Sequence, residues 1–412
     1  MNQRSRFYTR CMIFSVVIYC CCCRAKSTER TCQAVSQLAS MLRGGVGLKT
    51  FAIAVIAGDG IGHEVVPEGI RVLEAAGSHF GFGFEWHSFD WSCETYLASG
   101  KMMPADGLSQ LRKFDAIYLG AIGRPDIPDH ISLWGLLIPI RRAFQQYVNL
   151  RPVRLLEGIE TPLKNRKPAD IDFTIVRENN EGEYSNIGGR IYEGTKEETV
   201  VQQTVFTRTG VDRVLRFAFN LARRRKKHLT SATKSNGIIH TMPFWDERFR
   251  ILSLEYPDVR TDQYHIDILT AHFVRHPDWF DVVVGSNLFG DILSDLGPAV
   301  AGSIGMAPSA NLNPEREYPS MFEPVHGSAP DIAGKGIANP IGQIWSGALM
   351  LRHLGASEAS DAIEDAIATT LAESSVRTSD IGGSSSTTEL GEAIAQRLRT
   401  PNKQLSRPNS HP

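Results

Sequence analysis

Short, continuous apolar runs alternate along the chain with segments in which apolar residues recur at the spacing of a helix. The first run, residues 51–57, ends at Gly58-Asp-Gly60, and an apolar stripe follows it before Gly77. An uninterrupted run is typical of a strand buried on both faces of a parallel sheet, and the stripe predicts a helix that stops at the glycine. Further runs come at residues 116–119, 173–176, 266–269 and 280–284. This alternation predicts an α/β fold with a largely parallel sheet.

The glycines between the first predicted strand and helix admit two interpretations. From Gly58 to Gly62 their spacing is G-x-G-x-G, whereas a dinucleotide-binding turn has G-x-G-x-x-G. An acid about 20 residues further on would contact a ribose, but Glu74 lies inside the helical pattern and Glu85 comes late. A weak Rossmann signal and a plain strand-to-helix turn therefore both stay open.

Composition places the chain among globular proteins. It has 412 residues, of which 42% are hydrophobic and 22% charged, which suits one large or two medium domains. Disorder, collagen and a polytopic membrane protein are excluded. Residues 1–50 hold eight basic residues and one acid, so the net charge of -1 leaves the remainder mildly acidic. We expect no nucleic-acid-binding surface, because such a surface needs positive charge to displace counterions from phosphates.

The first fifty residues differ from the rest of the chain. Six of the seven cysteines precede residue 33, and an apolar run at residues 12–23 follows three arginines. The run is too short for a membrane span of about 20 residues, and a signal peptide, a transit peptide and a mispredicted start codon stay open. The body holds Cys93 alone, which favours a reducing compartment, the cytosol or the mitochondrion. The polar, proline-containing residues 400–412 are predicted to be a disordered tail.

Two aspartates stand four residues apart shortly after the run at 280–284. If Asp291 opens a helix, Asp295 projects from the same face, and the two like charges repel unless a cation lies between them. Hard oxygen ligands of this kind suit Mg²⁺ or Mn²⁺. Asp267 lies in the strand-like run at 266–269, where an unpaired acid is costly, and is a candidate third ligand. The alternative is a helix N-cap at Asp291 and an unrelated surface acid.

Several cationic side chains stand in apolar or turn surroundings. Arg141, Arg151 and Arg177 together could clamp a small polycarboxylate, because the guanidinium fork matches a carboxylate; singly, each could be a surface ion pair. Lys234 follows a predicted strand and could be a general base, with Tyr184 as the matching acid. A solvated lysine and a packed tyrosine are the alternative interpretation.

Two other segments carry weaker signals. Five consecutive basic residues, 223–227, follow the helical pattern of residues 211–222. Their position predicts a solvated helix end with favourable dipole contacts rather than a polyanion site. The segment from His326 to Asp331 is punctuated by glycine and proline and on its own predicts only a loop.

Taken in order, these motifs resemble the β-decarboxylating dehydrogenases, the family of isocitrate, isopropylmalate, tartrate and D-malate dehydrogenases. The resemblance runs from about residue 51 to residue 398. Its motifs are Gly58-Asp-Gly-Ile-Gly-His-Glu64, Asn149-Leu-Arg-Pro-Val153, Val176-Arg-Glu-Asn179, Ser231-Ala-Thr-Lys-Ser-Asn236, Asn287-Leu-Phe-Gly-Asp-Ile-Leu-Ser-Asp295, Glu323-Pro-Val-His-Gly-Ser-Ala-Pro-Asp331 and Ile337-Ala-Asn-Pro340.

The resemblance implies a fold. It is a doubly wound, two-domain α/β fold, isopropylmalate-dehydrogenase-like and not a Rossmann fold, in which the early glycines are a structural turn. An NAD-binding domain would combine residues 51–146 with 302–399, and residues 147–301 would form a substrate and dimerisation domain. Residues 1–50 would be an extension. The active protein would be a homodimer with shared active sites and no stable membrane span in the body.

The resemblance also implies roles for the candidate residues. Arg141, Arg151 and Arg177 would bind the carboxylates of a small 2-hydroxy dicarboxylate. Lys234 would accept the hydroxyl proton, and Tyr184 would protonate the enol. The implied ligands of Mn²⁺ or Mg²⁺ are Asp291 and Asp295, with Asp267 from the partner subunit. The residues implied at the NAD are His326, Gly327, Ser328, Ala329, Asp331 and Asn339. Because an acid at Asp331 repels a 2′-phosphate, NAD is expected rather than NADP.

Substrate choice depends on the segment before Arg141. Isopropylmalate enzymes carry a glutamate there and isocitrate enzymes a serine and an asparagine, whereas this chain has Trp134, Gly135 and Leu137, with an unusual Pro139. The segment resembles tartrate and D-malate dehydrogenases, so we expect NAD-dependent oxidative decarboxylation of D-malate and oxidation of tartrate. The alternatives are an isopropylmalate-type enzyme for a bulkier 3-substituted malate and a non-catalytic regulatory subunit.

Overall fold

The computed structural model describes residues 49–399. The expected N-terminal extension, apart from its last two residues, and the expected disordered tail lie outside the described residues. Within residues 49–399, no helix combines the length and the apolar character needed to cross a membrane.

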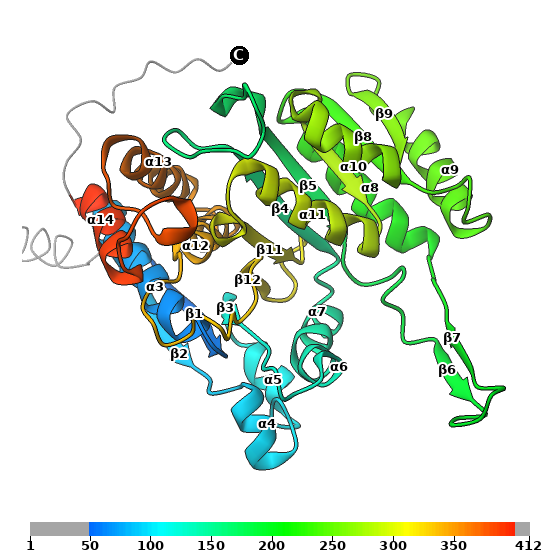
Figure 1. Cartoon of the computed structure of the whole chain (residues 1–412), viewed down its shortest axis with the longest axis horizontal. Coiled ribbons are helices and arrows are strands. Elements are labelled where there is room, and N and C mark those ends of the chain that lie inside the picture. Colours follow the sequence, from blue (N-terminus) through cyan, green and yellow to red (C-terminus); the bar gives the residue numbers. More distant parts are fainter. Residues whose placement is uncertain (1–48, 400–412) are drawn as a thin grey trace, which may run out of the picture. The chain divides into compact units, whose positions relative to one another are not determined.

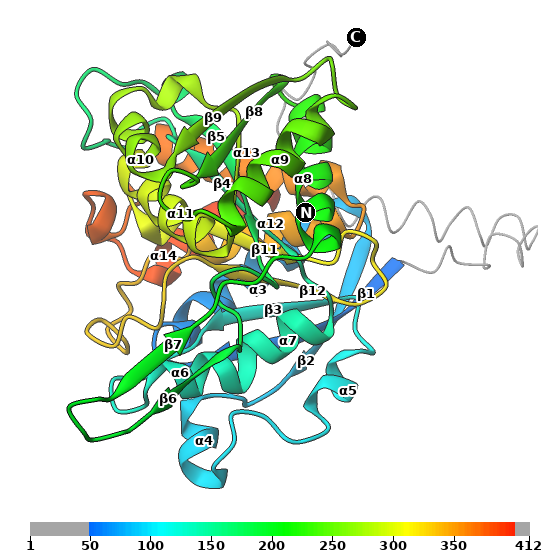
Figure 2. The same cartoon turned by 90° about the vertical axis from the view of Figure 1, so that its right-hand side faces the viewer.

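A ten-stranded sheet runs through the described part of the chain (Figure 1). Its strands lie in the order β2-β1-β3-β12-β11-β4-β5-β10-β8-β9. They are β1 (Lys49–Gly58), β2 (Phe82–Ser88), β3 (Ala116–Ala121), β4 (Val148–Arg154), β5 (Asp172–Glu178), β8 (His228–Thr233), β9 (Arg260–His265), β10 (Val282–Gly285), β11 (Pro308–Leu312) and β12 (Ser320–Pro324). Two more strands, β6 (Gly188–Ile191) and β7 (Thr199–Gln202), form an antiparallel hairpin that projects away from this sheet in both views (Figures 1 and 2).

The α/β class and the largely parallel sheet are confirmed, because five of the eight described strand pairs in the large sheet are parallel and three are antiparallel. Strands β1, β3 and β12 form one parallel block and β5, β10, β8 and β9 form another. Between the blocks, β11 is antiparallel to β12 and β4, and β4 is antiparallel to β5. A continuous apolar run indicates a strand that is buried on both faces. Central strands of a mixed sheet are buried in the same way, so the runs could not predict which pairs are antiparallel.

Helices cover both faces of the sheet. They are α3 (Gly62–Phe80), α4 (Cys93–Ser99), α5 (Gly107–Leu111), α6 (Asp129–Ser132), α7 (Ile138–Ala143), α8 (Arg208–Arg223), α9 (Thr241–Ser253), α10 (Ile266–Arg275), α11 (Asn287–Ala301), α12 (Ile341–His353), α13 (Ser357–Glu373) and α14 (Thr387–Arg399). The helices α3, α12, α13 and α14 pack together at one end of the sheet. Around β5 and β10, α8 lies on one face and α10 and α11 on the other.

Strand β1 shows why its sequence reads as a continuous apolar run. Ile53 and Val55 point into the core shared with α3 and α12, whereas Ala54 and Ile56 point into a second core with residues of α4 to α7. All four side chains are buried. Successive strand residues face opposite sides, so helices on both sides require apolar residues at every position.

One predicted element and one predicted helix boundary are wrong. The run at 266–269 is not a strand but the start of α10, whose buried residues Leu269 and Phe273 have helical spacing. A run of four apolar residues cannot distinguish a strand from a buried helix. The helix after β1 continues past Gly77 and ends at Gly81, which has a positive φ of 78°. Gly77 is compatible with a helix interior, and Gly81 adopts the left-handed conformation that ends many helices.

The early glycine motif is a strand-to-helix turn that also supports a distant loop. A Cβ on Gly60 would lie 2.1 Å from the carbonyl oxygen of Ser328, and the N–H of Ile61 donates to that same oxygen at 2.9 Å. The carboxylate of Asp59 accepts hydrogen bonds from the N–H groups of Cys93 and Gly123, each at 3.0 Å. The turn therefore holds the segment that begins at residue 326, and its glycine is required by the close approach of two backbones.

The basic run at 223–227 is neutralised by nearby acids. It begins at the last residue of α8, where Arg223 pairs with Asp258 at 2.6 Å. Arg225 pairs with the buried Asp281 at 2.7 Å and with Asp172 at 3.0 Å. The expected helix end is confirmed. Its basic side chains form ion pairs with nearby acids as well as contacting solvent.

The end of α12 generates a prediction about acid stability. The Nε2 of His353 lies 3.1 Å from the Ser320 hydroxyl, and its ring packs against Phe322. Burial, aided by Arg316, lowers the pKa of His353 to about 4. An unfolded histidine has a pKa of about 6.5. As the pH falls from about 6.5 to 4, the unfolded chain binds a proton that the folded chain does not, so stability decreases.

Replacing this side chain should remove that part of the pH dependence. Between pH 7 and pH 5, we expect the wild type to lose on the order of 1 kcal/mol more unfolding free energy than His353→Gln. Urea unfolding curves of both proteins at the two pH values measure the difference. Equal losses in both proteins would contradict the assignment.

Candidate active site

Helix α11 carries the two predicted carboxylates. It begins after Ser286, whose hydroxyl accepts from the N–H of Phe289, so the alternative in which Asp291 is the N-cap is wrong. Asp291 and Asp295 lie one turn apart inside the helix, on one face as predicted. A Cβ on Gly290 would lie 2.6 Å from the Cβ of Arg177. This glycine lets the helix approach β5 closely enough for its acids to meet the strand arginines.

The three predicted arginines come from α7, β4 and β5 and are not surface residues. Arg151 is 7% exposed and Arg177 5%, and Arg141 is only slightly more accessible. The guanidinium of Arg177 forms an ion pair with Asp291 and donates to Asn287 Oδ1 at 2.7 and 3.0 Å. The surface ion-pair interpretation is therefore wrong for Arg151 and Arg177.

Arg151 links both carboxylates of α11. Its Nη1 lies 3.5 Å from Asp291 Oδ1 and 3.6 Å from Asp295 Oδ1, and it donates to the Ser294 hydroxyl at 2.5 Å. Arg141 pairs with Glu323 on β12 at 2.7 Å. The buried Nε atoms of Arg141 and Arg151 have no hydrogen-bond partner in the described part of the chain. An anionic ligand needs hydrogen-bond donors beside positive charge, and these two N–H groups meet that requirement.

The charges within this cluster perturb one another. Burial acts to raise the pKa of Asp291, but Arg177 and Arg151 outweigh it and hold that pKa below its ordinary value. Burial raises the pKa of Asp295, and the neighbouring Asp291 adds to the effect while Arg151 opposes it. Burial lowers the pKa of Arg177 despite its ion pair.

Tyr184 joins the same cluster from the loop between β5 and β6. Its hydroxyl donates to Asp291 Oδ2 at 2.9 Å, and the Arg177 guanidinium lies 5.4 Å from its ring centre. Burial and the Asp291 charge raise the pKa of the phenol, which therefore keeps its proton. The residue is 37% exposed, so its ring is only partly packed and its hydroxyl faces the cluster.

Lys234 and Asp267 form a second group. Lys234 follows β8, and Asp267 lies in the first turn of α10 rather than in a strand. The ammonium lies 3.0 Å from Asp267 Oδ2, and the side chains are 30% and 66% exposed. The hydrogen bond from Lys234 lowers the pKa of Asp267. Across residues 49–399, no three His, Cys, Asp or Glu side chains converge closely enough to hold a metal ion, so Asp267 does not meet the α11 pair within one chain.

The predicted cofactor residues lie on the loop between β12 and α12. His326 Nδ1 is 3.0 Å from the Gly327 carbonyl, and its buried Nε2 has no partner among the described residues. Burial lowers the pKa of His326, which favours the neutral ring. Asn339 is buried and donates to Asp380 at 3.0 Å. Gly327 and Asp331 are exposed, Ser328 is buried, and Ala329 has a positive φ of 41°.

Sequence reasoning missed the residues that hold the arginines. Asn287, Ser294 and Glu323 bind Arg177, Arg151 and Arg141 respectively. The first two share a helical face with the predicted acids, at spacings of three or four residues, which is a signal that could have identified them. Glu323 comes from a different strand, and no local spacing connects it with Arg141.

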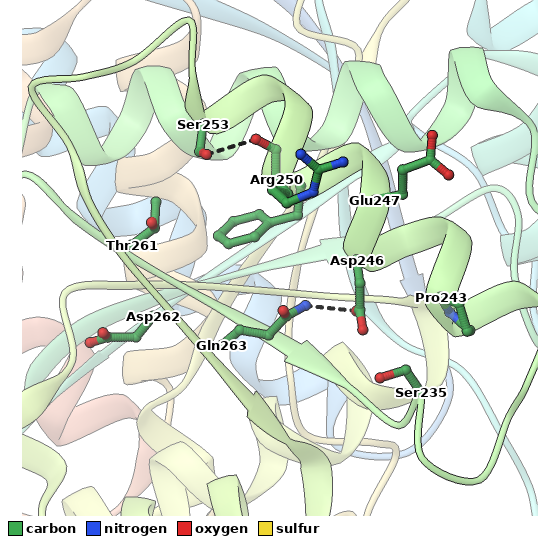
Figure 3. Close-up of a pocket in the computed structure, with 10 residues that line it drawn as sticks. Ser235, Pro243, Asp246, Glu247, Arg250, Ser253, Thr261, Asp262 and Gln263 are labelled. Carbon is green, nitrogen blue, oxygen red and sulfur yellow. Dashed lines mark hydrogen bonds between the residues drawn. The ribbon is translucent and has the colours of Figure 1, made fainter.

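A pocket of about 630 Å³ lies elsewhere on the protein, between α9 and β9 (Figure 3). Gln263 points toward Asp246 and donates to it at 2.6 Å. The pocket is lined by Ser235, Pro243, Asp246, Glu247, Phe249, Arg250, Ser253, Thr261, Asp262 and Gln263. It contains none of the predicted site residues, and the perturbed charges favour the arginine cluster as the active site.

Comparisons with known proteins identify the family. The model of the family described as isocitrate/isopropylmalate dehydrogenase matches residues 52–394. The chain is 58% identical to D-malate dehydrogenase [decarboxylating] of Escherichia coli (strain K12), over 85% of the chain and 99% of that protein. It is 59% identical to tartrate dehydrogenase/decarboxylase of Pseudomonas putida, over 85% and 98%.

A solved structure supports the fold. The crystal structure of isocitrate dehydrogenase from Methylococcus capsulatus matches with a TM-score of 0.77 and 34% identity, and covers 85% of this chain and 100% of that one. The predicted isopropylmalate-dehydrogenase-like fold is confirmed. Since the family model spans most of the chain and both relatives align along nearly their whole length, this chain belongs to the isocitrate/isopropylmalate dehydrogenase family of oxidoreductases.

Proposed function

We propose that the protein catalyses NAD-dependent oxidative decarboxylation of D-malate and oxidation of tartrate, with Mn²⁺ or Mg²⁺ as the metal. The observation that carries the proposal is the buried arginine cluster next to α11, in which the Nε atoms of Arg141 and Arg151 have no hydrogen-bond partner among residues 49–399. Such a site suits a small dianion with a neighbouring cation. The names of the two relatives, D-malate and tartrate dehydrogenases, support the substrate class.

The chain's own residues divide the proposed reaction among them. The three arginines bind and orient the substrate carboxylates. Lys234 accepts the proton of the 2-hydroxyl as the C2 hydride passes to NAD, and the β-carboxylate then leaves as CO₂. Tyr184, whose phenol keeps its proton, protonates the carbon that carried the lost carboxylate.

The donor set fits a hard divalent cation. Asp291 and Asp295 offer carboxylate oxygens on one helical face, and the Asp295 side chain is 63% exposed and so accessible to a ligand. A bound Mn²⁺ or Mg²⁺ would supply Lewis-acid polarisation of the substrate oxygens. Two acids are few for a metal site, so the proposal takes the third from Asp267 of the partner subunit.

A homodimer follows from this division and from exposed apolar surface. Ile268 and Val274 on α10 are 46% and 43% exposed, and Ile292 on α11 is 46% exposed. On the β6–β7 hairpin, Ile191 and Val200 are 56% and 62% exposed. Exposed apolar side chains on these elements are candidates for interface contacts. In the proposed dimer, Lys234 and Asp267 of one subunit complete the arginine cluster of the other.

The domain assignment remains part of the proposal. Residues 51–146 with 302–399 would bind NAD, and residues 147–301 would carry substrate and dimer contacts. The cofactor would lie against the loop from His326 to Asn339. Asp331 is exposed and could accept from the adenosine ribose hydroxyls, and its charge would repel the 2′-phosphate of NADP.

The cofactor loop is held by α3. The carboxylate of Glu64 accepts from the N–H of Gly334 at 2.6 Å and from that of Gly336 at 2.8 Å. Together with the hydrogen bond from Ile61 to Ser328, these bonds hold the loop against α3 and the turn that precedes it. Two hydrogen bonds to one ionised carboxylate are strong enough to order an exposed glycine-containing turn.

The first test is a substrate panel. Purified protein with Mn²⁺ and NAD should form NADH and release CO₂ with D-malate, and should form NADH with tartrate. The comparison includes 3-isopropylmalate and isocitrate, because Trp134 replaces the groups expected for those substrates. Turnover of 3-isopropylmalate alone would support the rival substrate, and inactivity with all of them would support a regulatory subunit.

Lys234→Ala should reduce kcat by at least about 100-fold, the usual contribution of a general base. The matched control is Lys113→Ala, an exposed lysine outside the cluster. Steady-state kinetics with D-malate measure both variants. Because the proposal places Lys234 in the partner's site, mixing inactive Lys234→Ala with inactive Arg177→Met protein should restore activity through mixed dimers. No restoration after subunit exchange would contradict shared sites.

Glu64→Gln should weaken NADH binding about tenfold, since it replaces one charge-assisted acceptor of a loop N–H by an amide donor. Fluorescence titration with NADH measures the Kd without turnover. Glu74→Gln is the control, because Glu74 lies on the same helix and accepts instead from Trp86 at 3.3 Å. An unchanged Kd for Glu64→Gln would contradict a contribution of these two bonds to cofactor binding.

A further inference from the structure

Consecutive arginines on α7 point to different partners. Arg141 pairs with Glu323 and belongs to the substrate cluster. Arg142 instead donates through Nη2 to the backbone carbonyl of Tyr184 at 2.8 Å. Its guanidinium also lies 4.8 Å from the ring centre of Trp134. Arg142 therefore contacts both the segment expected to select the substrate and the loop that carries the proposed proton donor.

The Trp134 end of this connection is firmly held. Trp134 lies in a π-helical turn, Leu133–Leu137, that continues directly into α7. Leu136 and Leu137 in this turn are buried in the core shared with β1 and β3. Pro139 is the second residue of α7, and because the π-helical turn precedes α7 directly, its missing N–H removes one helical hydrogen bond. The unusual Pro139 does not end the helix, which continues to Ala143.

The Tyr184 end depends on several restraints. Glu183 accepts from the Ser286 hydroxyl at 2.8 Å and from the N–H of Leu288 at 3.0 Å. The Ser185 carbonyl accepts from Gln202 at 2.8 Å. These contacts hold the residues on either side, and the Arg142 bond holds the Tyr184 backbone itself. Loss of Arg142 should therefore move the tyrosine without unfolding its loop.

The electrostatic setting suits a structural arginine. Burial lowers the pKa of Arg142, and Glu178 opposes the effect. A planar guanidinium can stack on an indole and donate an in-plane hydrogen bond at the same time, which a lysine ammonium cannot do equally well.

We propose that Arg142 is a positioning residue that couples the substrate-selecting segment at Trp134 to the Tyr184 hydroxyl. The proposal rests on the proposed function. It means that Trp134 affects proton delivery as well as substrate choice, because its ring fixes the arginine that fixes the tyrosine.

The activity test separates positioning from substrate binding. Arg142→Met should lower kcat with D-malate between about tenfold and a hundredfold, the cost of misplacing a reacting group by about 1 Å, while KM stays near the wild-type value. Arg142→Lys keeps a donor and should restore part of the rate. Arg112→Met is the matched control, because Arg112 also lies over an aromatic ring, 4.7 Å from that of Tyr318, but outside the cluster. A rise in KM with unchanged kcat would overturn the proposal.

Hydrogen exchange supplies a readout that needs no turnover. In Arg142→Met and in Trp134→Leu, amides of residues 182–187 should exchange faster than in the wild type and in Arg112→Met. Unchanged exchange in Arg142→Met would overturn the positioning role even if activity falls. If the wild type is inert with malate and tartrate, the proposed function has failed, and faster exchange in both variants still supports the coupling of Trp134 to the loop.

Discussion

The burial of two guanidinium groups against the carboxylates of one helix is the interaction on which the site depends. Arg151 and Arg177 project from adjacent antiparallel strands and meet Asp291 of α11. A buried charge is tolerated only when it is paired and hydrogen-bonded. The cluster satisfies this for the ion-pairing groups, and the Nε–H groups of Arg141 and Arg151 still have no partner within the described residues 49–399. These N–H groups are the donors that the proposed anionic substrate would use.

The fold serves this interaction by bringing a helix and two strands into close contact. Gly290 removes the side chain that would collide with Arg177, and the mixed centre of the sheet places β4 beside β5. Glu323 reaches Arg141 from β12, on the other side of β11. The site therefore collects residues from both parallel blocks, and Tyr184 enters it from a loop anchored on α11 through Glu183.

A second theme is that apparent binding motifs act as supports. The glycine turn after β1 contacts Ser328, and Glu64 holds Gly334 and Gly336. The turn thus contributes to the proposed cofactor region without being a dinucleotide fingerprint. Arg142 has a similar supporting role in the proposed substrate region, where it binds the backbone of Tyr184. In both places a charged side chain forms hydrogen bonds with backbone that lies outside helices and strands. These charge-assisted bonds replace the backbone–backbone hydrogen bonds that regular secondary structure would provide.

Sequence alone determined most of the elements, the family and the candidate residues, because periodicity and ordered motifs are local properties. The run of β1, the i,i+4 pair Asp291 and Asp295, and the strand before Lys234 were all predictable in this way. Tertiary structure decided what no spacing encodes. It set the antiparallel course of β11 and β4, the helical state of the run at Asp267, and the partners Glu323 and Arg142. These features depend on contacts between residues that are far apart in the sequence. A short apolar run or a single arginine is compatible with several sets of such contacts, and only the packing of the whole chain selects one.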